Sequence, residues 1–258
     1  MTDSVSVLSL SSDLVPPFFK SATLAEVRVA HGFFSRVGGV SPPPFSSLNF
    51  SSSVGDDPAN VRENLARLSR ALGFPRLAAL NQVHGDRVVE VGDDFLEESL
   101  VAGDAMITDQ KGIGLLIRQA DCQAVLLYDP ATPAVGIAHC GWRGSVAGIC
   151  SLTVRAMRDR YGSDPAAIRA AISPSLGPCC AEFRDWRQLL PQWMWRYRDL
   201  KSSFFDFPAI TRAQLVACGI PPANIDPEHH CNHCDPEFFS HRREGGETGR
   251  YGSIIGLL

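Results

Sequence analysis

Short apolar runs in the middle of the chain constrain its fold more than any other feature. Each run is too short for a helix, and those between residues 87 and 139 are separated by Gly, Asp and Pro, a pattern typical of strands in a buried sheet. Helical patterns flank these runs, so the sequence predicts a mixed α and β fold without fixing its topology. The expected strands are residues 27–34, 87–91, 105–108, 114–117, 123–128, 134–139 and 168–172.

The clearest helix signal follows Asp57-Pro58, which offers an N-cap and a proline at the first helical position. Apolar residues then recur at helical spacing until Gly73, which should end the helix. A second helix should end at Gly162 and present on one face the residues Val146, Ile149, Cys150, Thr153, Val154 and Met157. Further helices are expected over residues 182–200 and 211–218.

The chain of 258 residues contains no hydrophilic stretch that would divide it into two cores. We therefore expect an N-terminal segment, residues 1–25, followed by one catalytic domain, residues 26–258. A net charge of −4 and a pI near 6.0 argue against a nucleic-acid partner. No apolar run is long enough to cross a bilayer, and residues 1–20 lack the pattern of a secretory signal. We expect a cytoplasmic protein with no membrane role.

Three residues at the edges of expected strands could together bind a metal: His84, Cys122 and His139. Imidazole and thiolate both suit zinc, and three protein ligands leave a fourth position open for water or substrate. Such a site would be catalytic. The separations of 38 and 17 residues match no compact zinc finger, however, so packing of these residues in the core or in loops remains the alternative.

A second motif, His229-His230-Cys231-Asn232-His233-Cys234, contains a C-x2-C pair that could form half of a structural zinc site. We expect the other half to be missing, because the adjacent thiols Cys179-Cys180 do not readily offer paired tetrahedral geometry. Loop packing or inert thiols are the alternative for Cys231 and Cys234. Three further cysteines should be small core residues: Cys140, Cys150 and Cys218.

Arginines within a few residues of glycines are another indication of function, at Arg36, Arg143 and Arg242. Glycine lets the backbone approach an anion, and guanidinium binds phosphate through two parallel hydrogen bonds. Any one of these arginines could instead lie in a solvated surface turn. Trp142 could stack on a flat ligand, although a buried tryptophan is the simpler interpretation.

Ordered motifs extend from about residue 30 to the C-terminus, and together they resemble the YfiH-like family. This family is also called multicopper polyphenol oxidase or laccase-domain protein and, in bacteria, peptidoglycan editing factor. The matching stretches are His31 to Arg36 with Gly38 to Ser41, Leu48-Asn49 with Val54 to Asp57, Gln82 to Gly85, Gly103 to Ala105, Ala120 to Cys122, His139 with Gly141 to Gly144, Ile172 to Cys180, and Cys231 to Arg243.

The resemblance implies that His84, Cys122 and His139 bind Zn2+. It also implies an α+β fold, a single-domain α/β sandwich with mixed sheets that is shared with cysteine hydrolases. The implied activity is phosphorolysis of adenosine, inosine, guanosine and methylthioadenosine, with adenosine deamination beside it. Cys140, Ala181 and His241 stand where alanine, an aromatic residue and tyrosine are expected, which bears on substrate preference more than on the metal site.

The residues are consistent with this chemistry. Cys122, His139 and Asp121 are the candidate catalytic residues, with Asp121 as a proton shuttle or as an orienting partner of the metal ligands. An arginine would hold the phosphate that attacks the ribose C1 carbon, and a metal-bound water would attack the purine C6 carbon in deamination. The candidate substrate-binding residues are Arg36, Asn49, Gln82, Arg143 and Arg242.

Three other functions use the same residues differently. A hydrolase that edits a nucleotide-linked muropeptide would use Cys122 as nucleophile and His139 as base, and would survive chelation. Copper-dependent phenol oxidation is not expected, because seven histidines without an H-x-H pair cannot supply a multicopper cluster. A non-enzymatic metal-binding module is the third alternative.

Overall fold

Two mixed six-stranded sheets form the computed structural model, which describes residues 15–95, 98–226 and 230–258. Both sheets contain parallel and antiparallel pairs, so the expected α+β class with mixed sheets is confirmed. The first sheet has the order β1 (Phe18–Phe19), β2 (Val29–Phe34), β12 (Tyr251–Leu257), β7 (Ile113–Gln119), β3 (Arg76–Asn81), β5 (Glu98–Ala102). The second has the order β11 (Ile225–Asp226), β10 (Arg169–Ile172), β8 (Gln123–Asp129), β9 (Ala134–Cys140), β6 (Ala105–Thr108), β4 (Val88–Glu90).

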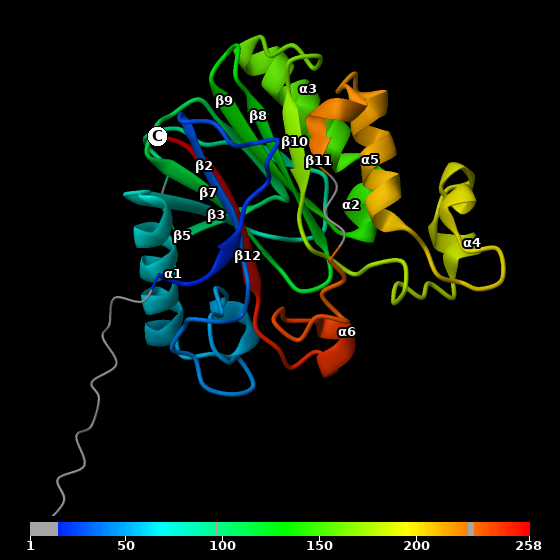
Figure 1. Cartoon of the computed structure of the whole chain (residues 1–258), viewed down its shortest axis with the longest axis horizontal. Helices are drawn as coiled ribbons and strands as arrows, with labels where there is room; N and C mark the ends of the chain where they lie inside the picture. The colour runs from blue at the N-terminus through cyan, green and yellow to red at the C-terminus, as the bar shows by residue number, and fades with distance from the viewer. Residues whose placement is uncertain (1–14, 96–97, 227–229) are drawn as a thin grey trace, which may run out of the picture.

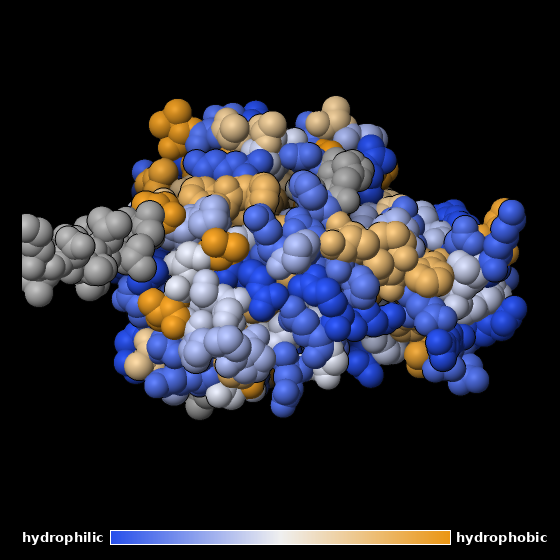
Figure 2. All heavy atoms as spheres, turned by 60° about the horizontal axis from the view of Figure 1, so that its bottom comes forward, coloured by the Kyte–Doolittle hydropathy of each residue, from blue (hydrophilic) through white to orange (hydrophobic). Residues whose placement is uncertain are grey.

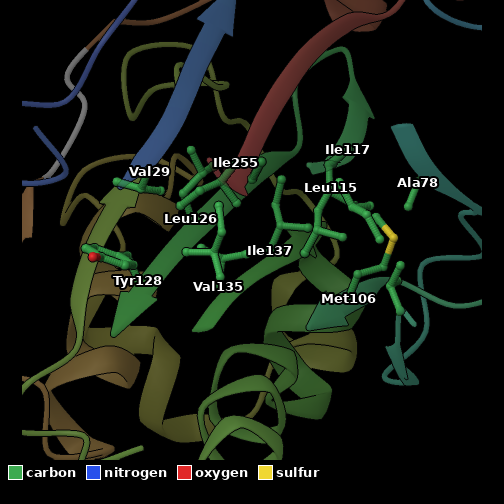
Figure 3. Packing of buried hydrophobic residues seen from close by; sticks show 14 of the residues in the cluster. Val29, Ala78, Met106, Leu115, Ile117, Leu126, Tyr128, Val135, Ile137 and Ile255 are labelled. Carbon is green, nitrogen blue, oxygen red and sulfur yellow. The ribbon is translucent and has the colours of Figure 1, made fainter. Parts of the chain in front are cut away.

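The two sheets pack face to face around the main hydrophobic core. Figure 3 shows this interface, in which side chains from β2, β7 and β12 meet side chains from β6, β8 and β9. Leu115, Ile117 and Ile255 of the first sheet and Leu126 and Ile137 of the second have no exposed surface. Every described residue of β8 and β9 is buried, because these strands are covered on both faces.

Helices cover the outer faces of the sheets, α1 on one side of the molecule and α3 and α5 on the other (Figure 1). Helix α1 (Pro58–Leu72) begins as expected at Asp57, whose side chain accepts a hydrogen bond from the Ala59 N–H, and it ends at Gly73 in the left-handed conformation. Helix α5 spans Phe207–Ala217, and α3 spans Ile149–Tyr161 and ends at Gly162. A short helix, α2 (Trp142–Ala147), precedes α3 and is separated from it by Gly148 in the left-handed conformation. The expectation that Val146 shares a helix and a buried face with Ile149 to Met157 is therefore wrong, since Val146 lies in α2 and is exposed.

The long helix expected over residues 182–200 is wrong. The segment contains only α4 (Trp186–Leu189) and a 3-10 helix, Gln192–Tyr197. Pro191 lies between them with an extended backbone. Proline has no backbone N–H to donate within a helix, so it interrupts the expected helix here. The apolar residues pack instead as a small aromatic cluster around Trp186, Met194 and Phe205. The remaining short helices are 3-10 turns at Ser52–Val54 and Pro222–Asn224, and α6 (His241–Glu244).

The expected boundary after residue 25 does not coincide with the edge of a sheet. Strand β1 pairs with β2, so Phe18 and Phe19 already belong to the first sheet. Residues 1–14 of the expected N-terminal segment lie outside the described residues. None of the helices in the described part of the chain is long and apolar enough to cross a membrane.

The connection between β7 and β8 crosses from the first sheet to the second and consists of Ala120, Asp121 and Cys122. The segment after β3 and the end of β9 approach this connection, which forms a corner of the sandwich, and they bring His84 and His139 to Cys122. Helix α6 lies at the bottom of the molecule in Figure 1. That side is turned forward in Figure 2, where mainly hydrophilic residues occupy the middle of the surface.

Candidate metal centre and cavity

The three expected metal ligands meet at this corner of the sandwich. One ligand atom from each of His84, Cys122 and His139 lies within 4.8 Å of the others, so the trio could hold a metal ion. The two imidazole rings are 4.8 Å apart between centroids and lie at 72° to each other. His139 is buried on β9, Cys122 is half-buried, and His84 is exposed, so the site is open on one side. One side of a bound ion would therefore face the solvent.

Asp104 orients two of these ligands, a role that sequence reasoning did not assign to it. Its carboxylate is fully buried and accepts a hydrogen bond of 2.8 Å from Nδ1 of His139. The same carboxylate accepts hydrogen bonds from the backbone N–H groups of Val83, His84 and Gly85. Because Nδ1 of His139 is engaged in this way, Nε2 is the nitrogen left to bind a metal. The carboxylate thus fixes both His139 and the loop that carries His84.

Cys122 and His139 change each other's ionisation. Burial opposes the thiolate, but the nearby His139 and His84 imidazoles lower the pKa of Cys122 to about 6. Burial also opposes the imidazolium, but the Cys122 thiolate and the Asp104 carboxylate raise the pKa of His139 to about 9. Despite its burial, Asp104 has a lowered pKa because His139 and the Gly85 N–H donate hydrogen bonds to it. Without a metal, this site therefore favours a thiolate beside an imidazolium at neutral pH.

The backbone at Gly141 packs closely against two of the trio, and the backbone at His84 and Asp121 is strained. A Cβ added at Gly141 would lie 3.0 Å from Cδ2 of His84 and 3.2 Å from Sγ of Cys122, so only glycine fits there without displacing a ligand. His84 and Asp121 both adopt positive φ angles, of 58° and 93°. Residues other than glycine rarely adopt this conformation, and such strain concentrates at functional sites.

Asp121 connects the trio to the C-terminal segment. One carboxylate oxygen accepts hydrogen bonds from Nδ2 of Asn232 at 3.0 Å and Oγ of Ser240 at 2.7 Å. The other accepts from the backbone N–H of Arg242 at 2.7 Å. These contacts tie the Asp121 side chain to the C-terminal segment and leave its carboxylate largely occupied.

A cavity of about 1040 Å³ extends from the trio to the space between α1 and the first sheet. Phe50, Val61, Leu65 and Leu116 give it an apolar wall. His84, Cys122 and His139 lie at its other wall, together with Asp121 and His241. Its size and mixed lining suit a small organic molecule with one flat apolar part.

Three arginines line this cavity, Arg62 from α1, Arg118 from β7 and Arg250 just before β12. Arg118 donates a hydrogen bond to the Leu80 carbonyl, and Arg250 donates to the carbonyls of Thr248 and Gly249. Burial lowers the pKa of both side chains. Among the described residues, none of the three forms an ion pair with a carboxylate. Their charges are therefore available to an anion, and none of the three is among the arginines singled out from the sequence.

The arginines expected from the sequence lie elsewhere. Arg36 pairs with Glu244 at 2.7 Å and lies over the ring of Phe239. Arg143 is exposed and stacks on Trp142 at 4.5 Å. The side chain of Arg242 points to the carbonyls of Cys180 and Glu182. None of these three arginines is among the residues that line the cavity.

Gln82 and Asn49 differ in their positions. Gln82 lines the cavity, but its amide exchanges two hydrogen bonds with the backbone of Arg118 and so holds β3 against β7. Asn49 is fully buried, and its amide contacts the Ser51 backbone, Asp56 and the Arg250 N–H. Asn49 thus supports the backbone of a cavity-lining arginine from behind.

The expectation that the C-x2-C pair lacks a second half is wrong. The Sγ atoms of Cys179, Cys180, Cys231 and Cys234 all lie within 4.8 Å of one another. Two segments that are 54 residues apart in the sequence meet here, a proximity that sequence spacing does not show. His229 of the same motif lies outside the described residues. Cys140 and Cys150 are buried as expected, whereas Cys218 is only partly buried.

Comparisons with known proteins agree with this architecture. The family described as multi-copper polyphenol oxidoreductase laccase matches residues 30–258. The chain is 36% identical over 249 residues to the purine nucleoside phosphorylase of Deinococcus radiodurans, with 93% of each chain covered. It is 35% identical over 243 residues to purine nucleoside phosphorylase YlmD of Geobacillus stearothermophilus, with 87% of this chain and 89% of that one covered.

Solved structures show the same fold. The crystal structure of YlmD from Geobacillus stearothermophilus superposes with a TM-score of 0.83 at 34% identity, covering 92% of this chain and 94% of that chain. The crystal structure of the hypothetical protein YfiH from Bacillus licheniformis also gives a TM-score of 0.83, at 35% identity, covering 89% and 93%. Extended sequence identity, fold and motif order agree, and the chain therefore belongs to the laccase-domain family that includes YfiH.

Proposed function

We propose that this protein is a zinc-dependent purine nucleoside phosphorylase that acts on adenosine, inosine, guanosine and methylthioadenosine, with adenosine deamination in the same site. The observation that carries the proposal is a single cavity that joins a His/Cys/His trio to three arginines without carboxylate partners among the described residues. The names of the relatives from Deinococcus radiodurans and Geobacillus stearothermophilus support the same activity.

The trio fits zinc by the chemistry of its donors. Two imidazoles and one thiolate are ligands that zinc prefers, and three protein ligands are typical of catalytic rather than structural sites. His84, Cys122 and His139 would hold the ion, with Asp104 orienting His139 and the His84 loop. A zinc ion bound there would supply a Lewis acid and a water of lowered pKa.

The arginines would bind the phosphate co-substrate. Guanidinium groups form paired hydrogen bonds with phosphate oxygens, and the half-buried Arg118 and Arg250 are already held in place by backbone carbonyls. A phosphate held beside them could attack the ribose C1 carbon as the bond to the purine breaks. The apolar wall formed by Phe50 and Leu116 would exclude water from this step and contact the purine or ribose.

One observation favours a second candidate, the cysteine hydrolase that edits a nucleotide-linked muropeptide. The lowered pKa of Cys122, about 6, and the raised pKa of His139, about 9, describe a thiolate and an imidazolium poised for nucleophilic attack. The two candidates place Cys122 in different roles. As a metal ligand the thiolate is a poor nucleophile, whereas as a nucleophile it must be free.

Metal removal distinguishes the candidates. We expect chelator-treated protein to lose nucleoside phosphorolysis and to regain it with added zinc, and Cys122→Ser to lose metal and activity together. In phosphate-dependent turnover, Arg62→Ala should raise the KM for phosphate about 10- to 100-fold, because a charge-assisted contact contributes roughly 1.5–3 kcal/mol. Arg143→Ala is the matched control and should leave this KM unchanged.

The measurement is purine release from each nucleoside with and without phosphate. Purine release that survives chelation and is abolished by alkylation of Cys122 would contradict the zinc mechanism and support a free Cys122 nucleophile. If Arg143→Ala loses phosphate dependence while Arg62→Ala retains it, phosphate binds at the surface beside Trp142 and not in the cavity.

A further inference from the structure

Four cysteines meet at a second site, which is built from different residues than the cavity. Cys179 and Cys180 lie in the loop after β10, and Cys231 and Cys234 lie in the loop after β11. The two loops are joined by a parallel bridge between Ser175 and Cys231. The Cys231 backbone carbonyl accepts hydrogen bonds of 3.0 Å from the N–H groups of Cys234 and Asp235, which folds the C-x2-C segment into a tight turn.

The sulfur separations fit a metal better than a disulfide. Sγ of Cys234 lies 3.4 Å from Sγ of Cys180 and 3.7 Å from Sγ of Cys179. Zinc–sulfur bonds of about 2.3 Å in a tetrahedron place neighbouring sulfurs roughly 3.8 Å apart, whereas a disulfide needs about 2.05 Å. Cys234 is therefore close to two sulfurs at once, and a disulfide could use only one of them.

The backbone is adapted to this close approach. A Cβ added at Gly177 would lie 2.9 Å from Cβ of Cys231 and 3.6 Å from Sγ of Cys179, so a larger residue would push the two cysteine pairs apart. The Gly177 N–H donates a hydrogen bond of 3.3 Å to Sγ of Cys231. A backbone N–H aimed at sulfur stabilises the thiolate form, which is the form that binds metal.

We propose that Cys179, Cys180, Cys231 and Cys234 form a second, structural metal site with four thiolate ligands, with zinc as its ion. Zinc replaces the four thiol protons, which are released to solvent, and the resulting thiolate site is negatively charged overall. Two arginines stand beside it. Arg243 donates to the carbonyls of Asn232 and His233 within the C-x2-C turn, and Arg242 lies against the Cys180 carbonyl.

The second site would hold the wall of the cavity in place. Asn232, between Cys231 and Cys234, donates to the Asp121 carboxylate, and the Leu176 N–H donates to the Asp121 carbonyl. Both loops that carry the four cysteines thus contact the residue next to Cys122. A metal that joins the loops would restrict the movement of Asp121 and of α6, whereas its loss would remove none of the ligands His84, Cys122 and His139.

Metal analysis of defined variants tests this proposal. We expect two zinc ions per chain in the full-length protein purified under reducing conditions. Cys234→Ser and Cys231→Ser should each lose one of them and keep the other, and Cys122→Ser should lose only the ion of the cavity. Cys218→Ser is the matched control, because Cys218 lies in neither group, and it should keep both ions.

A measurement on a variant that retains all four of these cysteines guards against misfolding. Zinc X-ray absorption of Cys122→Ser should show sulfur neighbours alone, at about 2.3 Å. Cobalt in the same variant should show the thiolate charge-transfer bands of a four-sulfur site. Nitrogen or oxygen neighbours, unchanged metal content in Cys234→Ser, or a disulfide found by mass spectrometry in freshly purified protein would each overturn the proposal. These results do not depend on nucleoside turnover, so they separate this proposal from the proposed function.

Discussion

At the candidate metal centre, one buried carboxylate holds both His139 and the backbone of the loop that carries His84. We expect Asp104→Asn to weaken zinc binding about 10- to 100-fold, the usual effect of removing a partner of a metal-binding histidine. The asparagine amide cannot accept all four hydrogen bonds that Asp104 accepts from His139 and the 83–85 loop. Competition with a chromophoric chelator measures the affinity.

Asp129→Asn provides the control for this change. Asp129 is equally buried and accepts hydrogen bonds from the Ala131 and Thr132 N–H groups, but it lies at the far end of β8 from Cys122. Both variants should lower stability, and only Asp104→Asn should lower zinc affinity. Equal zinc affinity in the two variants would show that Asp104 has no special role.

The pKa of Cys122 predicts how its reactivity changes with pH in the metal-free protein. Because the pKa is lowered to about 6, the thiolate persists at neutral pH and is protonated only as the pH falls through 6. The alkylation rate should therefore be half-maximal near pH 6, rather than near the ordinary cysteine value of about 8.5.

Cys218 gives an internal reference in the same digest, since burial raises its pKa and its alkylation should begin only at higher pH. Peptide mass spectrometry separates the two sites. A Cys122 profile that follows Cys218 would mean that the imidazoles of His84 and His139 do not stabilise its thiolate.

Some functional residues could be found from the sequence and others could not. His84, Cys122 and His139 stand in motifs that the family resemblance singles out. Asp104 stands in the matching stretch Gly103 to Ala105, but nothing there shows that it orients His139, and the cavity arginines lie in no motif that was singled out, because these roles arise when segments distant in the sequence meet. Arg118 and Arg250, for example, reach the same cavity because β7 pairs with β12, which sets Gly252 opposite Arg118.

At the level of elements, the success of sequence reasoning follows the continuity of the apolar pattern. Strands β6, β8 and β9 are mainly apolar and buried along their whole length, and they were predicted within a residue at each end, although β9 contains one glycine, Gly136. Strand β12 was missed because Gly252, Ser253 and Gly256 interrupt its pattern. Gly256 is needed there, since a Cβ would lie 2.3 Å from the Ile113 carbonyl oxygen.

The start of α2 illustrates how one element controls the site. We expect Gly141→Ala to lower zinc content sharply, because its Cβ would press on both His84 and Cys122. The comparison is Gly148→Ala, at the other end of α2. Gly148 has a positive φ of 78°, and a Cβ added there would lie in open space.

The second variant should therefore lose roughly 1 kcal/mol of stability through backbone strain and keep its zinc. Elemental analysis and urea unfolding of both variants provide the comparison. If Gly141→Ala and Gly148→Ala lose equal amounts of zinc, the loss results from disturbing α2 as a whole and not from the contact at Gly141.

For the whole molecule, the order of strands makes the C-terminus central to stability. Strand β12 pairs with both β2 and β7, so without residues 251–257 the first sheet would be divided into two separate parts. Its side chains also reach separate parts of the core. Ile255 and Leu257 pack between the sheets, Ile254 packs under α1, and Tyr251 packs against Phe238.

We therefore expect deletion of residues 251–258 to abolish cooperative unfolding rather than to trim one edge of the protein. Removing one large buried side chain costs roughly 2–5 kcal/mol, and β12 supplies four of them, which together match the whole stability of an ordinary domain, about 5–15 kcal/mol. Deletion of Leu258 alone is the control, because its side chain is 47% exposed. Near-ultraviolet circular dichroism and urea unfolding should show a native transition in the control and none in the longer deletion. A cooperative transition in the longer deletion would mean that the first sheet can form without β12 between β2 and β7.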